Sequence, residues 1–261
     1  MSTPKSIFEI DSEEEYLKYK DSININRKKP FGETALFKVP YKKAKWLIKH
    51  NIDIHSKEEH SGKNALFYSD FHTTSLLIKR GIDINIVDKS GNNALFMTNN
   101  ISKVKLLLKG GININQVNGM NQNALFKFGD NPQISKLLIE SGIDISHVDK
   151  FGQNALSLAN CGTFQLLVDK GININQRNIQ GNSLLSWVDY AKAKILIDKI
   201  YDFSEFTDER MEELHDRGCM SPEKKDLITK RILQLQLLEE KKMLENILIN
   251  PHEENKHKKR L

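Results

Sequence analysis

The chain has little of what disulfide bonding, membrane insertion or export requires. Two cysteines, Cys161 and Cys219, occur in 261 residues, which is too few for a disulfide framework and is typical of a reducing compartment. No apolar run approaches the roughly 20 residues that a membrane-spanning helix needs. The segment Met1–Tyr19 carries the acids Glu13–Glu15 where a secretory signal would be apolar. We therefore expect a cytoplasmic protein, or one exported by a route that its sequence does not reveal.

The usual groupings of reactive residues are also missing. The chain has no Gly-rich phosphate loop and no nucleophile elbow. His50, His55 and His60 are spaced by five residues, which does not place them on one helix face, and no cysteine or carboxylate set accompanies them. Cys161 precedes Gly162 in a predicted inter-helix loop without a basic neighbour, so an inert thiol is expected. We expect no enzyme activity, no metal and no cofactor.

A repeated string dominates what is present. Asn-Ala-Leu-Phe or a close variant returns every 29 to 31 residues, six times, beginning at Thr34, Asn64, Asn93, Asn123, Asn154 and Ser183. A fixed period of this length is typical of stacked units that cannot bury an apolar face alone and build one continuous core together. Function is then expected on the surface of the stack.

One copy illustrates the local structure of a unit. The cluster Asp88–Gly91 predicts a turn, and Asn93 then caps a short inner helix of about two turns. An apolar stripe of Val104, Leu107 and Leu108 predicts an outer helix, which Gly110-Gly111 ends. The alternating tetrad Ile112–Asn115 predicts an extended finger with both isoleucines facing inward.

In this order of elements the chain resembles the ankyrin repeat family. The matching motifs are the turn Asp-x-x-Gly at Asp88 and Asp149, the helix start x-Ala-Leu after Asn93, and Leu-Leu followed by Gly at Leu107 and Leu138. The resemblance covers roughly residues 12–199 and implies an all-α solenoid that binds proteins.

The chain departs from the family pattern in three ways. Its units are about three residues shorter than the family's usual unit of about 33. Phenylalanine replaces the family's histidine at the end of the helix motif, which predicts a stacked apolar ladder of Phe37, Phe67, Phe96 and Phe126. Asn121 stands at a turn position where glycine is expected, and asparagine tolerates the left-handed backbone there.

The ends of the array differ from its middle. Ser12 predicts the cap of a helix in an N-terminal half-repeat, residues 1–31, which precedes an array of about six units over residues 32–203. Residues 204–250 contain a predicted long helix that opens at Pro222, and residues 251–261 form a basic tail predicted to be disordered. The 204–250 segment can cover the last repeat as a cap or pair with a second copy as a dimer seam, and we favour the cap because its leucines keep no heptad.

The net charge of +5 resides in the repeats. Residues 204–261 contribute −1 and the remaining residues +6. Many lysines alternate with apolar stripes, as in the segments Tyr41–Lys45 and Lys103–Lys105. Such lysines are expected to form solvated helix faces. The alternative is a weak interaction of these faces with nucleic acid or another polyanion.

The residues around each turn glycine vary while the repeat frame is kept. Because the ankyrin resemblance implies binding through turn tips and the concave inner-helix face, these positions are our candidate partner-binding residues. They are Phe31, Glu33, His60, Lys63, Lys89, Asn92, Met120, Gln122, Lys150, Phe151, Gln153 and Ile179. The large apolar members are either interface anchors or covers for a neighbouring turn.

We expect a non-catalytic scaffold for protein–protein interaction, monomeric unless the C-terminal helix pairs two copies. The richness in Asn, Ile and Lys resembles bacterial members of the family. Some of those are delivered into host cells as effectors and others neutralise toxins as immunity proteins. No residue of the sequence distinguishes these roles or identifies the partner.

Overall fold

The computed structural model describes residues 6–200 and 203–249, with side chains as far as residue 245. The basic tail predicted at residues 251–261 lies outside them. The described residues form 11 α-helices, several 3-10 helices and no strand beyond isolated β-bridges. Contacts divide the chain into two compact units, residues 1–166 and 167–261. None of the described helices is long and apolar enough to cross a membrane.

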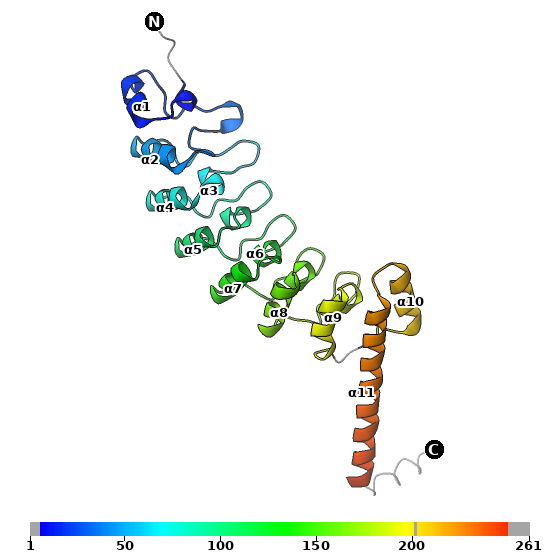
Figure 1. Ribbon diagram of the computed structural model, residues 1–261. Helices are drawn as coiled ribbons and strands as arrows, with labels where there is room; N and C mark the ends of the chain where they lie inside the picture. The colour runs from blue at the N-terminus through cyan, green and yellow to red at the C-terminus, as the bar shows by residue number, and fades with distance from the viewer. Residues whose placement is uncertain (1–5, 201–202, 250–261) are drawn as a thin grey trace. The chain divides into compact units, whose positions relative to one another are not determined.

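The first unit is a stack of paired helices (Figure 1). Its outer helices are α2 (Tyr41–Lys49), α4 (Phe71–Lys79), α5 (Ile101–Lys109) and α7 (Pro132–Glu140). Each contacts the next along the row. A second row is made of the inner helices α3 (Ala65–Tyr68), η3 (Ala94–Met97), α6 (Ala124–Lys127) and η4 (Ala155–Leu158). Each inner helix is four residues long, shorter than the predicted two turns.

The N-terminal end of this unit contains one more helix than the sequence indicated. Before α1 (Glu13–Tyr19), which Ser12 caps as predicted, lies a 3-10 helix, η1 (Ile7–Glu9). Ile7 and Ile10 are completely buried, and the Tyr16 ring stacks on Trp46 of α2 with centroids 5.3 Å apart. Since η1 takes the inner position and α1 the outer one, the N-terminal cap is a complete helix pair. A short helix, η2 (Pro30–Gly32), follows in the first turn.

Asparagine caps fix the start of the four inner helices α3, η3, α6 and η4. In η3 the Asn93 Oδ1 accepts from Leu95 N at 3.1 Å, and the same residue's Nδ2 donates to Asn113 O at 2.8 Å. One side chain therefore caps the helix and holds the finger of its own repeat. Asn121 adopts φ of 56° in its turn, as predicted for an asparagine that replaces glycine.

Three local predictions are wrong. The tetrad Ile112–Asn115 is a turn, because the Asn113 side chain accepts from Asn115 N at 3.1 Å and bends the backbone, leaving Ile112 buried but Ile114 only half-buried. Cys161 is the first residue of α8 (Cys161–Asp169) and does not lie in a loop. Among the described residues no two ladder phenylalanines pair their rings, although all four are buried; the ring of Phe37 instead meets Tyr68 at 5.7 Å.

Lys103 was also expected on a solvated face and is instead buried, with 4% exposure. Its Nζ donates to Leu66 O at 3.0 Å and to Ser69 O at 2.6 Å, at the end of the preceding inner helix. Burial lowers the pKa of this amine to about 8, partly opposed by the carboxylate of Asp70. Lys43, the third residue of α2 as Lys103 is of α5, reaches Phe8 O of η1 at 3.4 Å. Lysine at this helix position thus ties an outer helix to the inner helix before it.

The second unit contains the end of α8 followed by η5 (Leu184–Ser186), α9 (Tyr190–Ile197), α10 (Asp208–Asp216) and α11 (Pro222–Ile249). Phe203, Phe206, Met211 and Leu214 are buried, and α11 packs along α9. Beyond Ile228 the exposed leucines Leu233, Leu237 and Leu244 mark a stretch of α11 that this unit leaves uncovered.

Candidate protein-binding surface

Three successive turns of the first unit, which begin at Asp88, Asn118 and Asp149, are each folded by one Asx side chain. Asp88 Oδ1 accepts from Ser90 N and from Asn92 N, both at 2.9 Å. Asp149 Oδ1 accepts from Phe151 N at 2.9 Å and Gln153 N at 3.0 Å. A carboxylate that bonds two backbone amides closes the turn and fixes the direction of the residues between them.

Backbone hydrogen bonds then join each turn to the next. Lys89 N donates to Ser61 O at 2.8 Å, and Gly119 N donates to Ser90 O at 2.7 Å. The first and last turns of the unit are joined in the same way, through Phe31 O and Lys150 N. The turns therefore form a continuous row on the side away from the outer helices (Figure 1), and their side chains project from a fixed support.

The structure places the candidate residues in two groups. Phe31, His60, Lys89, Lys150, Phe151 and Ile179 are exposed at turn tips, with Met120 half-buried among them. Phe31 is 57% exposed although its ring lies 4.1 Å from that of His60 in the next turn, so it both covers a neighbour and remains accessible. Its φ of 75° is a left-handed conformation that a large side chain rarely adopts.

The second group consists of the residues after the turn glycine, and these hold the turns together. Lys63 Nζ lies 3.8 Å from the buried carboxylate of Asp88, and Asn92 Nδ2 donates to the same group at 3.2 Å. Gln122 and Gln153 contact the Asp149 side chain, and Glu33 pairs with Lys38. Their part in binding stays a prediction.

A groove on the inner-helix side was not predicted. It has a volume of about 340 Å³ and is lined by Asn92, Phe96, Met97, Asn118, Gln122, Phe126, Lys127 and Leu158. Met97, Lys127 and Leu158 occupy the same position in successive repeats, four residues after the capping asparagine. That position varies while its neighbours repeat. The same signal that selected the turn residues would therefore have found this position, although not the groove that the three residues line together.

At the equivalent position of an earlier repeat, Tyr68 belongs to a polar cluster. Its hydroxyl donates to Glu58 Oε2 at 2.8 Å, and Lys38 Nζ lies 4.6 Å above its ring. Burial, with the hydrogen bond to Glu58, raises the pKa of Tyr68 to about 12. Hydrogen bonds from Ser61 and Tyr68 lower the pKa of the Glu58 carboxyl. The cluster stays a neutral phenol beside a carboxylate at physiological pH.

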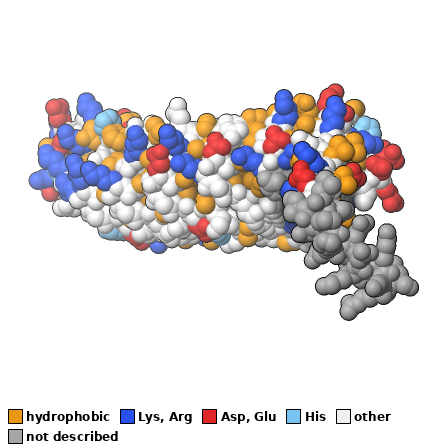
Figure 2. Space-filling model, turned by 90° about the horizontal axis from the view of Figure 1, so that it is seen from below, with side chains coloured by type: hydrophobic (Ala, Val, Ile, Leu, Met, Phe, Trp, Pro, Cys, Tyr) orange, Lys and Arg blue, Asp and Glu red, His pale blue; other side chains and the backbone are white. Residues whose placement is uncertain are grey.

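Lysine and arginine side chains gather at the N-terminal end of the first unit (Figure 2). A groove of about 540 Å³ there is lined by Asp11, Ser12, Glu13, Glu14, Lys42, Lys45, Trp46 and Lys49. Glu13 accepts from Lys49 Nζ at 2.6 Å and pairs with His50 Nε2 at 2.8 Å, and these contacts lower the pKa of its carboxyl. Acids thus interleave with the lysines. No set of three His, Cys, Asp or Glu side chains in the described part of the chain is arranged to hold a metal ion.

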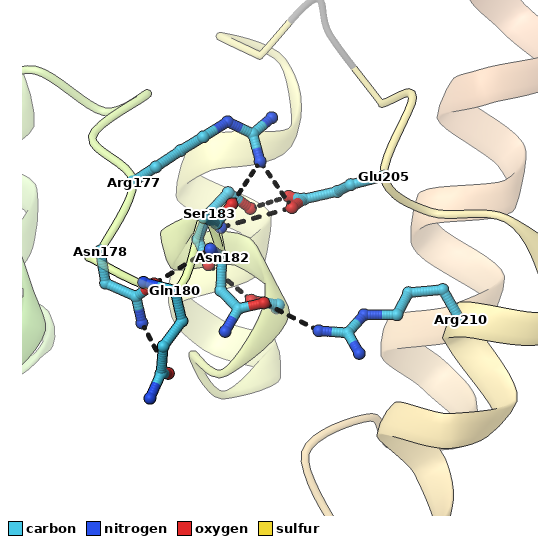
Figure 3. Close-up of polar contacts among 9 residues, drawn as sticks. Arg177, Asn178, Gln180, Asn182, Ser183, Glu205 and Arg210 are labelled. Carbon is cyan, nitrogen blue, oxygen red and sulfur yellow. Dashed lines mark hydrogen bonds and ion pairs between the residues drawn. The ribbon is translucent and has the colours of Figure 1, made fainter.

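In the second unit the last turn is met by residues from the C-terminal segment (Figure 3). Glu205 accepts from Arg177 Nη1 at 2.8 Å and from the backbone and hydroxyl of Ser183. Arg210 Nη2 donates to Asn182 Oδ1 at 2.8 Å. The carboxylate and guanidinium therefore contact residues immediately after the turn glycine, as side chains of a following turn do elsewhere in the array.

Comparisons with known proteins agree with this architecture. Residues 93–178 match three copies of the ankyrin repeat. A search of curated proteins finds no match. Among solved structures, a chain from the complex of the predatory endopeptidase Bd0816 of Bdellovibrio bacteriovorus with the immunity protein Bd3460 is 25% identical, with a TM-score of 0.52 over 60% of this chain and 90% of that chain. The predicted all-α ankyrin-type fold is confirmed.

Proposed function

We propose, from the ankyrin repeats that this chain carries at residues 93–178, that it is a non-catalytic scaffold which holds a protein partner on its turn row and inner-helix side. Ankyrin repeats generally serve protein–protein interaction. The observation that carries the proposal is the hydrogen-bonded row of turns, since it keeps Phe151 42% exposed on a rigid support. Large apolar side chains held in this way are favoured interface anchors.

The similarity to a chain from an endopeptidase–immunity protein complex favours one form of this function. We infer an immunity-type role, in which the scaffold binds and neutralises a harmful enzyme. Such a role requires a tight, specific surface and no catalytic group in the scaffold itself. An effector role uses the same surface and differs only in the identity of the partner.

Photo-crosslinking from defined positions tests the scaffold proposal. A benzoylphenylalanine residue replaces Phe151 on the turn row in one variant and Lys109 on outer helix α5 in the control, and each full chain is expressed in its native cell. We expect one discrete protein adduct from position 151 and none from position 109. Equal adducts from both positions, or adducts from position 109 alone, would place the binding surface elsewhere. Thermal melts of both variants check that the fold is kept.

The immunity form has its own test once the adduct is identified by mass spectrometry. Co-expression of the captured protein with the parent chain should restore growth that the captured protein alone arrests. A captured protein without toxicity, or toxicity that the parent chain leaves unchanged, would reject the immunity role while the scaffold role stands.

A further inference from the structure

The inner-helix groove of the first unit has an apolar floor and an exposed apolar rim. Phe96 and Phe126 are buried beneath it, whereas Met97 and Leu158 are 43% and 54% exposed at its edges. A volume of about 340 Å³ lies at the small end of the range for ligand sites. It has room for one bulky side chain and the backbone on either side, and is too small for a folded domain.

Amide side chains make up the polar part of the groove. Asn118 Nδ2 lies 3.5 Å from Gln122 Oε1, and Gln122 Nε2 lies 3.4 Å from Asp149 Oδ2. Both separations are long for hydrogen bonds, so both contacts are weak and exchangeable. Asn118 Oδ1 accepts from two turn amides, so this residue offers a peptide its Nδ2 donor. Gln122 has both a donor and an acceptor for the alternating N–H and C=O groups of an extended peptide.

The charge around the groove has one sign. Lys127 is the charged residue among those that line the groove, and Lys89 and Lys150 are exposed on the turns. Asp88 and Asp149, the nearest flanking acids on the turn row, are buried with their carboxylates bonded to turn amides. The accessible charge on this part of the surface is therefore positive.

We propose that this groove binds an extended acidic segment of the partner protein that inserts one bulky apolar side chain between Met97 and Leu158. Carboxylates beside that side chain meet Lys127 and the turn lysines, while Asn118 and Gln122 bond the segment's backbone. The inference rests on the proposed scaffold function and specifies the chemistry of what is bound.

Selection from a displayed library of random 12-residue peptides on the immobilised full chain tests this. Enriched peptides should share an aromatic or large aliphatic residue flanked by aspartate or glutamate. A synthetic copy of the most enriched peptide should bind the parent at least tenfold more tightly than its copy with lysine in place of each acid. Its affinity should fall as salt rises, because exposed charge pairs are screened.

Variants link the selected peptide to the groove. Leu158→Glu and Lys127→Glu should each weaken binding at least tenfold, whereas Lys105→Glu, the same charge change on outer helix α5, should leave it within twofold. Leu158 and Lys127 are exposed, so their replacement should leave the melting temperature unchanged. No enrichment, enrichment of basic peptides, or equal loss with Lys105→Glu would overturn the inference.

The outcome is separable from that of the scaffold proposal. A protein adduct from position 151 together with a failed peptide selection would reject the acidic-segment inference and retain the scaffold. Absence of both would reject the two proposals together.

Discussion

At the third position of α5, Lys103 places an ammonium group inside the stack, where it donates hydrogen bonds to two backbone carbonyls. Desolvation lowers its pKa in the folded chain to about 8 from the ordinary 10.5. Between these pH values the unfolded chain binds more protons than the folded chain, so the free energy of unfolding should increase with pH. Below pH 8 the amine is charged in both the folded and the unfolded chain, so it gives no such increase in the free energy of unfolding.

The prediction is a rise of up to about 3 kcal/mol in the contribution of Lys103 between pH 8 and 10.5. Urea unfolding of the parent and of Lys103→Met across this range measures it, because the variant removes this titration and keeps the others. Parallel pH profiles for the two proteins would show that the Lys103 amine is solvated in the folded state.

Phe96 is one of the two inner members of the buried series of four phenylalanines, with 6% exposure. Its truncation to alanine should lower the free energy of unfolding by about 3 to 5 kcal/mol, as for other buried aromatic residues. Met97→Ala, next to it but exposed, is the matched control and should change stability by less than about 1 kcal/mol. Chemical denaturation compares them, and overlapping unfolding curves for Phe96→Ala and the parent would contradict the burial of this ring.

The contacts of some single residues could be predicted from the sequence, and those of others could not. The caps at Ser12 and Asn93 are predictable because the acceptor and the amide that it bonds are two or three residues apart. Lys103 is not, because its acceptors belong to the preceding repeat, and a lysine on an amphipathic helix is solvated in most proteins. The turn at Asn113 was not predicted, because the alternation of Ile and Asn indicates an extended segment. The hydrogen bond that an Asx side chain makes to a nearby backbone amide favours a turn instead.

At the scale of an element, the inter-repeat turn depends on its Asx side chain and little on charge. The first positions of successive turns are Asp88, Asn118, Asp149 and Asn178, and each side chain accepts from backbone amides two and four residues on. Asp149→Asn should therefore leave stability within about 0.5 kcal/mol. Asp149→Ala should cost about 1 to 2 kcal/mol, because two turn amides lose their acceptor.

Thermal and urea unfolding of these two variants decide the matter. A loss with Asp149→Asn as large as that with Asp149→Ala would show that the negative charge, and not the geometry of the side chain, holds the turn. Asp149→Ala should also weaken capture of the partner more than Asp149→Asn does, since Phe151 is positioned by the hydrogen bond from its own amide to Asp149.

Helix order and spacing were predictable from the period alone, and the inner-helix groove was not. Repetition identifies the residues that build the frame, because the same contacts recur in each unit. The groove is formed by Met97, Lys127 and Leu158, which differ from one another, and only stacking of the helices shows that they line one surface.

At the scale of the whole molecule, the C-terminal segment provides what a seventh repeat would. Lys224 is the third residue of α11, as Lys43 is of α2, and its Nζ donates to Val188 O at 2.7 Å, just after η5. Glu205 and Arg210 bond the last turn. The first turns of α11 therefore stand where an outer helix would, which favours the cap over the dimer seam.

Ending the chain after Phe203 tests this arrangement. The shortened chain should aggregate or melt at a lower temperature, because it exposes the apolar flank of the last repeat. A monomer with the melting temperature of the parent would reject the cap. The control for the dimer seam is Leu237→Glu with Leu244→Glu in the full chain, which should leave a monomeric parent unchanged by light scattering and melting.

The two buried lysines have a further consequence for how opening of the chain can be followed. An amine with a pKa near 8 is largely uncharged at mildly alkaline pH and is an effective nucleophile, yet Lys103 and Lys224 are almost completely shielded by the fold. Each will react with an acylating reagent only while its surroundings are open. Lys103 lies in the first unit and Lys224 in the second. The rate at which each lysine is acylated, followed by peptide mass spectrometry, therefore measures the local opening of each unit separately within one native molecule.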